Sequence, residues 1–574
     1  IVQFGGFCTG DIISDKGLGL TNHHCGKRNI QQLSSLENNY LEDGFWAQNE
    51  GEELPSQGLY VRFIIRIEEI SAIVLEGIGD DLSEGQRKAL IDRNIRTIKK
   101  ETPKEDYQQI MIKPFFHGNQ YFLFVTETYR DVRLVGTPPA AIGEFGSDSH
   151  NWVWPRHAGD FSLFRIYADK DNKPAAYSPD NIPFKPRHFL PVSTAGISEG
   201  DFTMIFGFPG KTDEYLPSPA IEQIVDVLNP VKIGIRDKAL EIMTSAMKAD
   251  EKTRLQYAAK QFRMANSWKK WIGQNQGFKS TGAIAKRKAL EAEFFRRINE
   301  DKVLKNKYGH LLEDFQSLYS QLEPYALSKS YIDEIGNRNI ELFQLANQLY
   351  SYARVFENNG EAVFKKRLDR LETTLVNFYK DYNPEIDRAI FAALMEEYFN
   401  GPNREHLSTY AIAQIEEAGK DYKKWSEIVF SKSMLSNEAK TMALFKNDPV
   451  AFIQSITTDY AYELARSIVD TGRKQVSKPY NAIQNRINLL QRQYMLALME
   501  VFPEKRFYPD ANGTLRVSYG QVTGFSPRDG IYYKPFTYLS GVMEKYIPDD
   551  YEFDVPQKLR DLYQNKDFGV YGEN

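Results

Sequence analysis

Hydrophobic residues occur in short clusters through the first 212 positions, and in the run that begins at Asp160 they alternate with polar ones. Short runs rich in β-branched and aromatic residues are separated there by Gly, Pro and Asp, a pattern typical of half-buried strands joined by turns. We expect strands at Leu59–Ile67, Gln108–Phe116, Tyr121–Leu134, Asp160–Tyr167 and Asp201–Phe208. Residues 1–212 are therefore predicted to form a β-barrel or β-sandwich.

One helix is expected to interrupt this β region. Ser83 and Gln86 have the spacing of a capping box, in which each side chain bonds to the backbone N–H of the other residue. Apolar residues then recur on one helical face, at Leu90, Ile91, Ile95 and Ile98.

Residues 213–506 change to the helical period of 3.6 residues. Glycine is also sparse in this part, with 10 of the 38 glycines of the chain in 294 residues. One periodic run comprises Ala239, Ile242, Met243, Ala246 and Met247. Several such helices, joined by short breaks of Asn, Gly and Pro, predict an all-α domain.

Strand and turn character returns after Pro509, in the sequence TLRVSYGQVTGFSPRDGIYYKP. The simplest organisation is one β domain, formed by 1–212 and 507–574, with a helical domain inserted at 213–506. The fold class expected is therefore α+β.

Composition places the chain among ordinary globular proteins, and its 574 residues are too many for one hydrophobic core. A net charge of −5 without a basic stripe argues against nucleic acid as the main partner. No run of 18 apolar residues occurs, so no membrane span is expected. The histidines outside the first hairpin show no HExxH or Cys-His ligand spacing, so we expect neither a metal nor a cofactor.

The stretch Cys8–Cys25, CTGDIISDKGLGLTNHHC, contains the first candidate chemistry. Two strand-like runs are joined by Asp15-Lys16-Gly17, a turn whose glycine can adopt a positive φ. Cys8 and Cys25 are the only cysteines, and because facing positions on adjacent strands lie within disulfide reach, we expect them to be bonded. A disulfide favours an oxidising compartment. The chain opens in a strand-like run without a starting methionine, so we expect that an N-terminal segment was removed.

A histidine pair closes this stretch, and the run TNHHC resembles the catalytic-histidine hairpin of chymotrypsin-like proteases. The resemblance implies that His24 is the catalytic base and His23 its neighbour. It also implies a role for Asp160, which opens an alternating strand after a glycine: its carboxylate would hold the His24 imidazole in the right tautomer. The alternative is an ordinary disulfide-linked hairpin with two exposed histidines.

Further motifs extend the resemblance over essentially the whole chain. They are GLGLTNHHCG, NYLEDGFWA, GEELP, NWVWPRHAGDFSLFRIYAD, GFPGKT and YGQVTGFSPRDGIYY. The chain resembles the bacterial dipeptidyl-peptidase 7 and 11 family, and most of all its dipeptidyl-peptidase 7 branch. These are serine exopeptidases of the chymotrypsin clan.

This resemblance implies a chymotrypsin-like double β-barrel with a large inserted all-α domain. It implies release of dipeptides from the free N-terminus of peptides, a homodimer, and a location in the periplasm or at the surface of a Gram-negative bacterium. It leaves open whether the first specificity pocket prefers hydrophobic or acidic residues.

The family motifs also imply a site for the α-amino group of the substrate. Asn151 and Trp152 match two of its residues, and Asn266 matches a third from the helical domain. In the expected helix Thr253–Ile272, the amide of Asn266 falls on a face where the period calls for an apolar residue, beside Leu255, Ala259 and Phe262. A hydrogen bond between helices is the alternative role, because a buried amide needs a partner.

The nucleophile is where the chain departs from the family pattern. The family's Gly-Asn-Ser-Gly-Ser-Pro loop does not occur in the 574 residues, so the serine is expected beyond the end of this chain. Gly196–Gly200 matches the G-x-S-x-G pattern, but a strand rather than a helix is expected after it, which makes Ser198 a loop residue. The Gly207–Thr212 run lacks Walker spacing and predicts a connection between domains.

Two other functions fit the same pattern. One is a chymotrypsin-like endopeptidase, which would cleave N-acetylated peptides as well as free ones. The other is a non-catalytic peptide-binding protein, which the missing serine motif favours.

Overall fold

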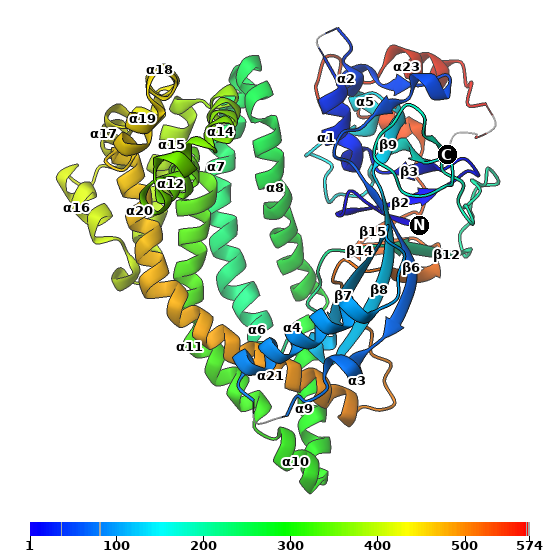
Figure 1. Ribbon diagram of the computed structural model, residues 1–574, viewed down its shortest axis with the longest axis horizontal. Helices are drawn as coiled ribbons and strands as arrows, with labels where there is room; N and C mark the ends of the chain where they lie inside the picture. Colours follow the sequence, from blue (N-terminus) through cyan, green and yellow to red (C-terminus); the bar gives the residue numbers. More distant parts are fainter. Residues whose placement is uncertain (36, 80–81, 570, 572–574) are drawn as a thin grey trace. The chain divides into compact units, whose positions relative to one another are not determined.

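The computed structural model describes residues 1–35, 37–79, 82–569 and 571, with residues 251, 255 and 258 described by their backbone alone. The chain divides into two compact units (Figure 1). We call Ile1–Tyr215 together with Phe502–Asn574 the β unit, and Leu216–Val501 the helical unit. In the described ranges, no helix has the length and apolar character needed to cross a bilayer.

Antiparallel strands of the β unit make up one large sheet. These strands are β1 Val2–Phe4, β2 Cys8–Ile12, β3 Leu18–Thr21, β4 Phe45–Trp46, β5 Leu54–Pro55, β6 Val61–Glu69, β7 Gln108–Phe115, β8 Gln120–Tyr129, β9 Asp131–Thr137, β10 Ser162–Ala168 and β11 Ile182–Pro183. The main path runs β4-β9-β10-β3-β2-β1-β6-β8-β7, with β11 beside β10 and β5 beside β9. The expected strand Tyr121–Leu134 is in fact two strands, because β8 ends before Arg130 and β9 pairs with different neighbours.

The expected double barrel is not found in the described residues. The two ends of the sheet path, β4 and β7, pair only with β9 and β8, so hydrogen bonding does not close the sheet. β12 Phe202–Gly207 pairs with β13 Arg516–Gln521, and β14 Phe525–Arg528 pairs with β15 Ile531–Tyr533, as two separate ribbons. The observed architecture is therefore mixed helix and antiparallel sheet, without a closed barrel among these strands.

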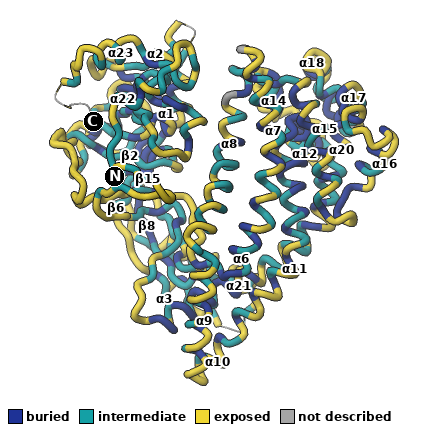
Figure 2. The backbone as a smooth tube through the Cα atoms, turned by 180° about the vertical axis from the view of Figure 1, so that it is seen from behind, coloured by how far each residue is buried: buried dark blue, intermediate teal, exposed yellow. Residues whose placement is uncertain are grey.

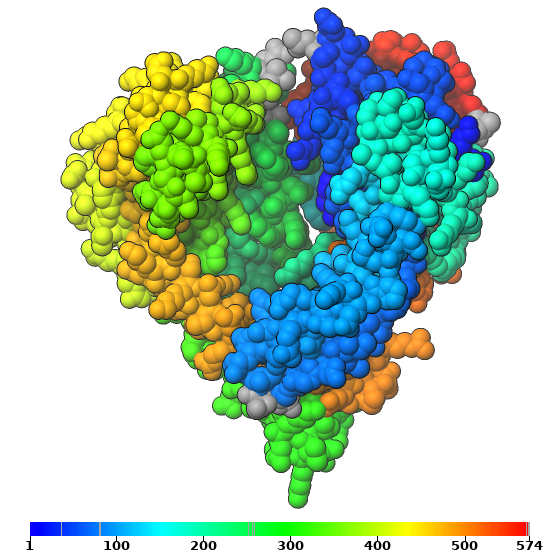
Figure 3. All heavy atoms as spheres, viewed as in Figure 1, coloured from blue at the N-terminus to red at the C-terminus, as the bar shows by residue number. Residues whose placement is uncertain are grey.

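A few short helices and one long helix complete the β unit. They are α1 His23–Leu33, α2 Tyr40–Asp43, α3 Ser71–Val74, α4 Glu84–Glu101, α5 Ala140–Gly143, α22 Leu539–Met543 and α23 Gln557–Gln564. The capping box predicted for α4 is confirmed, with Ser83 Oγ accepting from Gln86 N–H and Gln86 Oε1 accepting from Ser83 N–H. Ile91, Ile95 and Ile98 pack on a small core that includes Leu123. Figure 3 shows α4, β7 and β8 as one continuous light-blue surface.

The helical unit contains the longest helices of the chain. Its helices are α6 Ser218–Glu222, α7 Asn229–Ala249, α8 Glu251–Ser280, α9 Ala283–Glu300, α10 Lys302–Tyr308, α11 Leu311–Tyr331, α12 Glu341–Asn359, α13 Glu361–Lys365, α14 Leu368–Lys380, α15 Pro384–Asn400, α16 Thr409–Glu417, α17 Tyr422–Lys432, α18 Glu438–Asn447, α19 Pro449–Ile456, α20 Tyr460–Thr471 and α21 Lys478–Val501. Turns of π-helix follow α6, α11 and α20, at Gln223–Leu228, Ile332–Asn339 and Gly472–Ser477.

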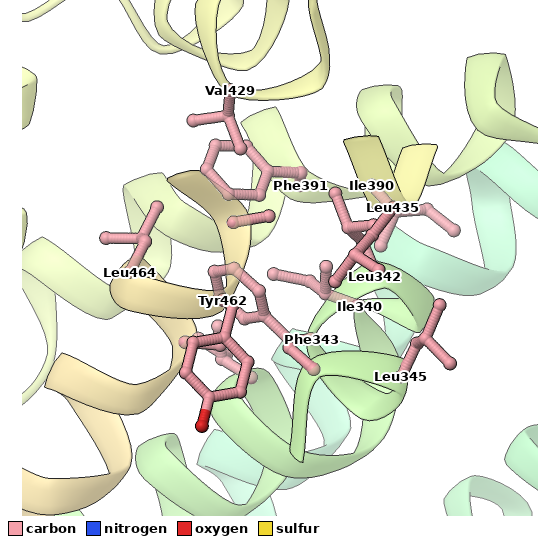
Figure 4. Packing of buried hydrophobic residues seen from close by; sticks show 14 of the residues in the cluster. Ile340, Leu342, Phe343, Leu345, Ile390, Phe391, Val429, Leu435, Tyr462 and Leu464 are labelled. Carbon is pink, nitrogen blue, oxygen red and sulfur yellow. The ribbon is translucent and has the colours of Figure 1, made fainter. Parts of the chain in front are cut away.

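One hydrophobic core holds most of these helices together. Figure 4 shows its centre, where Phe343 of α12 meets Phe391 of α15 edge to face, with ring centroids 5.6 Å apart. The chain around α12 and α15 is accordingly coloured largely as buried in Figure 2. All buried members of this core lie between Ile235 and Val476, so the helical unit has a core of its own.

Candidate active site

The hairpin of β2 and β3 leads directly into the first turn of α1. β3 ends at Thr21, and Asn22 keeps an extended backbone before His23 begins the helix. The disulfide between Cys8 and Cys25 is present, with Cα atoms 6.2 Å apart. Its local geometry corrects our expectation: Cys25 lies in the first turn of a helix, not on a strand facing Cys8. The helix begins directly after Asn22, whose backbone carbonyl accepts the N–H groups of Cys25 and Gly26 at 3.2 and 3.3 Å.

Strand pairing brings Asp160 beside His24. β10 pairs with β3 so that Ser162 lies opposite Thr21, which places the residues just outside the two strands next to each other. Asp160 Oδ1 accepts the backbone N–H of His24 at 3.0 Å, and Oδ2 lies 2.8 Å from His24 Nδ1. The Asn22 side chain also donates to the Asp160 carbonyl at 3.1 Å. Asp160 therefore contacts His24 at two points.

The two partners differ in solvent exposure. The His24 side chain is 60% exposed and that of Asp160 only 19%. Burial by itself raises the pKa of Asp160, but the hydrogen bonds from His24 and the charge of Arg156 outweigh it, so this pKa lies below its ordinary value. Asp160 is thus a carboxylate near neutral pH, and the proton on His24 belongs on Nδ1, facing it.

This arrangement leaves the other ring nitrogen of His24 as the basic atom. None of the described residues hydrogen-bonds to His24 Nε2. An exposed imidazole with a free Nε2 lone pair and a carboxylate on Nδ1–H can take a proton from a hydroxyl group or from water. The pair is therefore suited to act as a general base with its orienting carboxylate.

Asn151 and Trp152 lie in the same connection as Asp160, between α5 and β10. Asn151 is buried in a turn, and its backbone N–H donates to the Asp148 carbonyl at 3.1 Å. Trp152 has a left-handed backbone with φ of 62°, and its side chain is 63% exposed. A non-glycine residue in that conformation is uncommon.

Asn266 lies on α8, on the same face as Ala259 and Phe262, but that face is not the buried one: Phe262 is 40% exposed and Ala259 is exposed too. The buried side chains in the described part of α8 are instead Thr253, Tyr257, Met264 and Ala265. The side chain of Leu255 lies outside the described residues. Asn266 itself is half-buried. The periodicity predicted the wrong buried face because α8 carries aromatic and apolar residues on more than one face. Packing against other helices decides which of these faces is buried.

Two other motifs behave as the sequence predicted. Ser198 lies in an exposed loop, where its N–H donates to Asp201 Oδ2, and the strand β12 follows it. This excludes the strand-to-helix elbow of a G-x-S-x-G nucleophile. The Gly207–Thr212 run joins β12 to the first helix of the helical unit.

Sequence reasoning missed the residues that surround His23. Its ring is fully buried, with Nδ1 3.0 Å from Thr137 Oγ1 and Nε2 3.8 Å from Glu144 Oε1. Nothing local signals these contacts, because Thr137 and Glu144 lie more than a hundred positions further along the chain. Two histidines in sequence at a helix start were the only hint.

Two further features border the His24–Asp160 pair. The potential ligand atoms of Cys8, His24 and Cys25 lie within 4.8 Å of one another, but both sulfurs are in the disulfide and cannot bind a metal as thiolates. A cavity of about 650 Å³ is lined in part by Gly159, the residue before Asp160, and its polar lining includes Arg156, His157 and Asp567. The loop that carries Asp160 thus has an open side.

Comparison with known proteins identifies the family of the chain. A model of the family described as Peptidase S46 matches residues 1–574. An Asp/Glu-specific dipeptidyl-peptidase of Flavobacterium psychrophilum is 47% identical over 578 residues, which cover 100% of this chain and 80% of that protein. Dipeptidyl-peptidase 7 of Porphyromonas gingivalis is 36% identical over 586 residues, covering 100% of this chain and 79% of the relative.

A solved structure is similar as well. The crystal structure of Porphyromonas endodontalis DPP11 in complex with the dipeptide Arg-Glu matches with a TM-score of 0.84 at 31% identity, covering 100% of this chain and 82% of that one. The family expected from the motifs is therefore confirmed. The chain is a peptidase and belongs to the peptidase S46 family.

Proposed function

We propose that this peptidase releases dipeptides from the free N-terminus of peptides by acyl transfer, with His24 as general base. The observation that carries the proposal is the two-point contact between Asp160 and His24. A nucleophilic serine would attack the second peptide carbonyl while its hydroxyl proton passes to His24 Nε2. The same proton then goes to the leaving amine, and water hydrolyses the acyl-enzyme by the reverse sequence.

The serine of this proposal comes from outside residues 1–574. The reason is the absence of the Gly-Asn-Ser-Gly-Ser-Pro string together with the exposed loop position of Ser198. The His24 side chain is 60% exposed, as expected for a base that meets a nucleophile from another part of the protein.

We propose an acidic residue at the second position of the substrate. The relatives from Flavobacterium psychrophilum and Capnocytophaga gingivalis named Asp/Glu-specific are 47% and 45% identical to this chain, against 36% for dipeptidyl-peptidase 7 of Porphyromonas gingivalis. The similar solved structure also holds the dipeptide Arg-Glu. This favours the acidic branch over the hydrophobic one.

The free amine of the substrate is proposed to be held by Asn151, Trp152 and Asn266. Amide oxygens suit an ammonium group, since each accepts one of its three hydrogens. In this proposal the helical unit is a lid that closes one end of the cleft and leaves room for two residues before the scissile bond.

The remaining features of the proposal concern the whole protein. It would have a chymotrypsin-like double β-barrel, act as a homodimer, and work in the periplasm or at the surface of a Gram-negative bacterium. The disulfide between Cys8 and Cys25 supports such a compartment, because thiols stay reduced in most cytosols.

The test compares substrates and variants of the full-length protein. A fluorogenic dipeptidyl amide with Glu at its second position should be cleaved faster than one with Leu, and N-acetylation should abolish cleavage. His24→Ala and Asp160→Asn should each lower kcat/KM on the order of 10⁴-fold, because the base or its tautomer is lost. Glu37→Gln, a change in a surface loop, is the control.

Each outcome decides between named functions. Equal cleavage of the acetylated substrate would identify an endopeptidase. Tight peptide binding without turnover would identify a binding protein. Full activity in His24→Ala would refute the proposed base.

A further inference from the structure

The buried neighbour of the proposed base, His23, has an environment that a merely space-filling residue would not need. Its ring is 0% exposed and packs against the backbone of Gly143, where an added Cβ would lie 2.7 Å from ring atoms. Thr137 Oγ1 lies 3.0 Å from Nδ1 on one side, and Glu144 Oε1 lies 3.8 Å from Nε2 on the other. Within the described part of the chain, Nε2 has no hydrogen-bond partner. A buried polar atom left in this state calls for an explanation.

Burial keeps the His23 ring neutral. Burial lowers the pKa of His23 below its ordinary value; the charges of Glu144 and Asp160 act against that shift, and those of Lys27 and His24 act with it. Glu144 is itself bound to Lys27, whose Nζ lies 2.7 Å from Oε2. If Nε2 carries the proton and directs it at the Glu144 carboxylate, Nδ1 is an acceptor, and the Thr137 hydroxyl donates to it at 3.0 Å rather than to the Pro138 carbonyl at 3.3 Å. Both ring nitrogens then face a group of the right polarity.

The position of His23 relative to its neighbours shows what this environment achieves. Three successive side chains attach the first turn of α1 to different parts of the β unit. His23 contacts the end of β9 and α5, His24 contacts Asp160 before β10, and Cys25 is bonded to Cys8 in β2. Asn22, at the N-cap, makes no side-chain cap to the helix. The rotation of this turn therefore depends on tertiary contacts rather than on helix capping.

We propose that His23 is a positioning residue, whose clamped imidazole fixes the first turn of α1 and so directs His24 at Asp160. This rests on the proposed role of His24 as base. The disulfide alone does not fix the orientation of the first turn of α1. It attaches this turn at one point, Cys25, and the turn could still rotate about that point. His23 supplies a second fixed point directly next to the base.

The test uses variants that keep or remove each polar contact. His23→Leu has a similar size but neither ring nitrogen, and should lower kcat at least tenfold with KM within twofold. His23→Asn places an amide where Nδ1 lies and should restore part of the loss. Thr137→Val, which removes the hydroxyl but keeps the shape, should lower kcat about threefold or more even if His23→Leu does not fold.

The control separates positioning from stability. Leu123→Ala creates a cavity in the small core beneath α4, away from the site, so it should lower the unfolding midpoint and leave kcat unchanged. The inference would be overturned if His23→Leu folded and if its kcat, like that of His23→Asn and Thr137→Val, stayed within twofold of the parent.

A second readout is independent of turnover. In the 574-residue chain, the proton shared by His24 Nδ1 and Asp160 should give a downfield NMR resonance that disappears in Asp160→Asn. It should broaden or vanish in His23→Leu and Thr137→Val but persist in Leu123→Ala. The two proposals can fail separately. If the resonance weakens in His23→Leu and Thr137→Val but His24→Ala keeps full activity, then His23 positions His24 although His24 is not the base. An unchanged signal in folded His23→Leu would refute the positioning role alone.

Discussion

Asp160 couples the imidazole of His24 to the helix that carries it. One carboxylate oxygen binds the side chain of His24 and the other binds its backbone N–H at the start of α1. An anion is favoured there by the partial positive charge of a helix N-terminus. A shift of α1 would therefore break both hydrogen bonds together, so the base is either aligned with its carboxylate or released from it.

This carboxylate should make the stability of the β unit depend on pH. The pKa of Asp160 is lowered in the folded state, so between that value and the ordinary pKa of about 3.9 the unfolded chain binds more protons. The stabilisation is then present above about pH 4 and is lost as the pH falls through the folded-state pKa. Urea unfolding of Asp160→Asn should differ from the parent at pH 6 and converge with it toward pH 3.

A change at Asp15→Asn provides the comparison, since this aspartate is exposed in the β2–β3 turn. Its unfolding free energy should follow the parent at every pH. A constant difference between Asp160→Asn and the parent from pH 6 to pH 3 would contradict the link between Asp160 ionisation and folding.

The first backbone N–H groups of α12 are capped by a side chain from another helix, α15. The residue before α12 is Ile340, which has no side-chain group to cap it. Asp387 of α15 takes this role from a fully buried position, accepting the N–H groups of Glu341 at 2.7 Å and Leu342 at 2.8 Å. The start of α12 thus depends on a residue of another helix.

Removing this distant cap should be costly. Asp387→Ala leaves two buried N–H groups without acceptors, and each such group costs about 1–3 kcal/mol. We expect the unfolding free energy of the helical unit, followed by far-UV circular dichroism, to fall by about 3 kcal/mol or more. Asp421→Ala, which removes the exposed N-cap of α17, should lose only about 1 kcal/mol. Equal losses in the two variants would show that burial of the cap is unimportant.

Elements were predictable where local signals sufficed. The α4 capping box and the strand after Ser198 followed from residues a few positions apart. The break at Arg130 was not predictable, because β8 and β9 form one continuous strand-like run in the sequence and differ only in the strands with which they pair. The buried face of α8 and the surroundings of His23 were also hidden, since contacts between distant segments decide them.

For the whole molecule, the two connections between the units are bonded to each other within the β unit. Tyr215 Oη donates to the Tyr508 carbonyl at 2.6 Å, and Thr212 Oγ1 lies 2.8 Å from Asp510 Oδ1. The helical unit therefore leaves and re-enters the β unit at one place. The sequence predicted an insertion from composition, whereas the double barrel was expected from family resemblance alone, and the described strands do not close one.

Because the helical unit has its own core, the chain should unfold in two steps. Calorimetry of residues 1–574 should resolve two transitions, and a fragment of residues 216–501 should reproduce one of them within a few degrees. Asp387→Ala should shift that transition only. A single transition, shifted as a whole by the variant, would show that the units unfold together.

The ribbon of β12 and β13 has a consequence for concentrated solutions. Phe202, Ile205 and Tyr519 are exposed on it, and among the residues that the structure describes each of its two strands pairs only with the other. Such a ribbon offers free backbone N–H and C=O groups along both edges, with apolar faces between them. Attraction between copies of the chain should therefore be short-ranged and should arise from apolar contact rather than from charge. The osmotic second virial coefficient should then be negative, and salt should make it more negative.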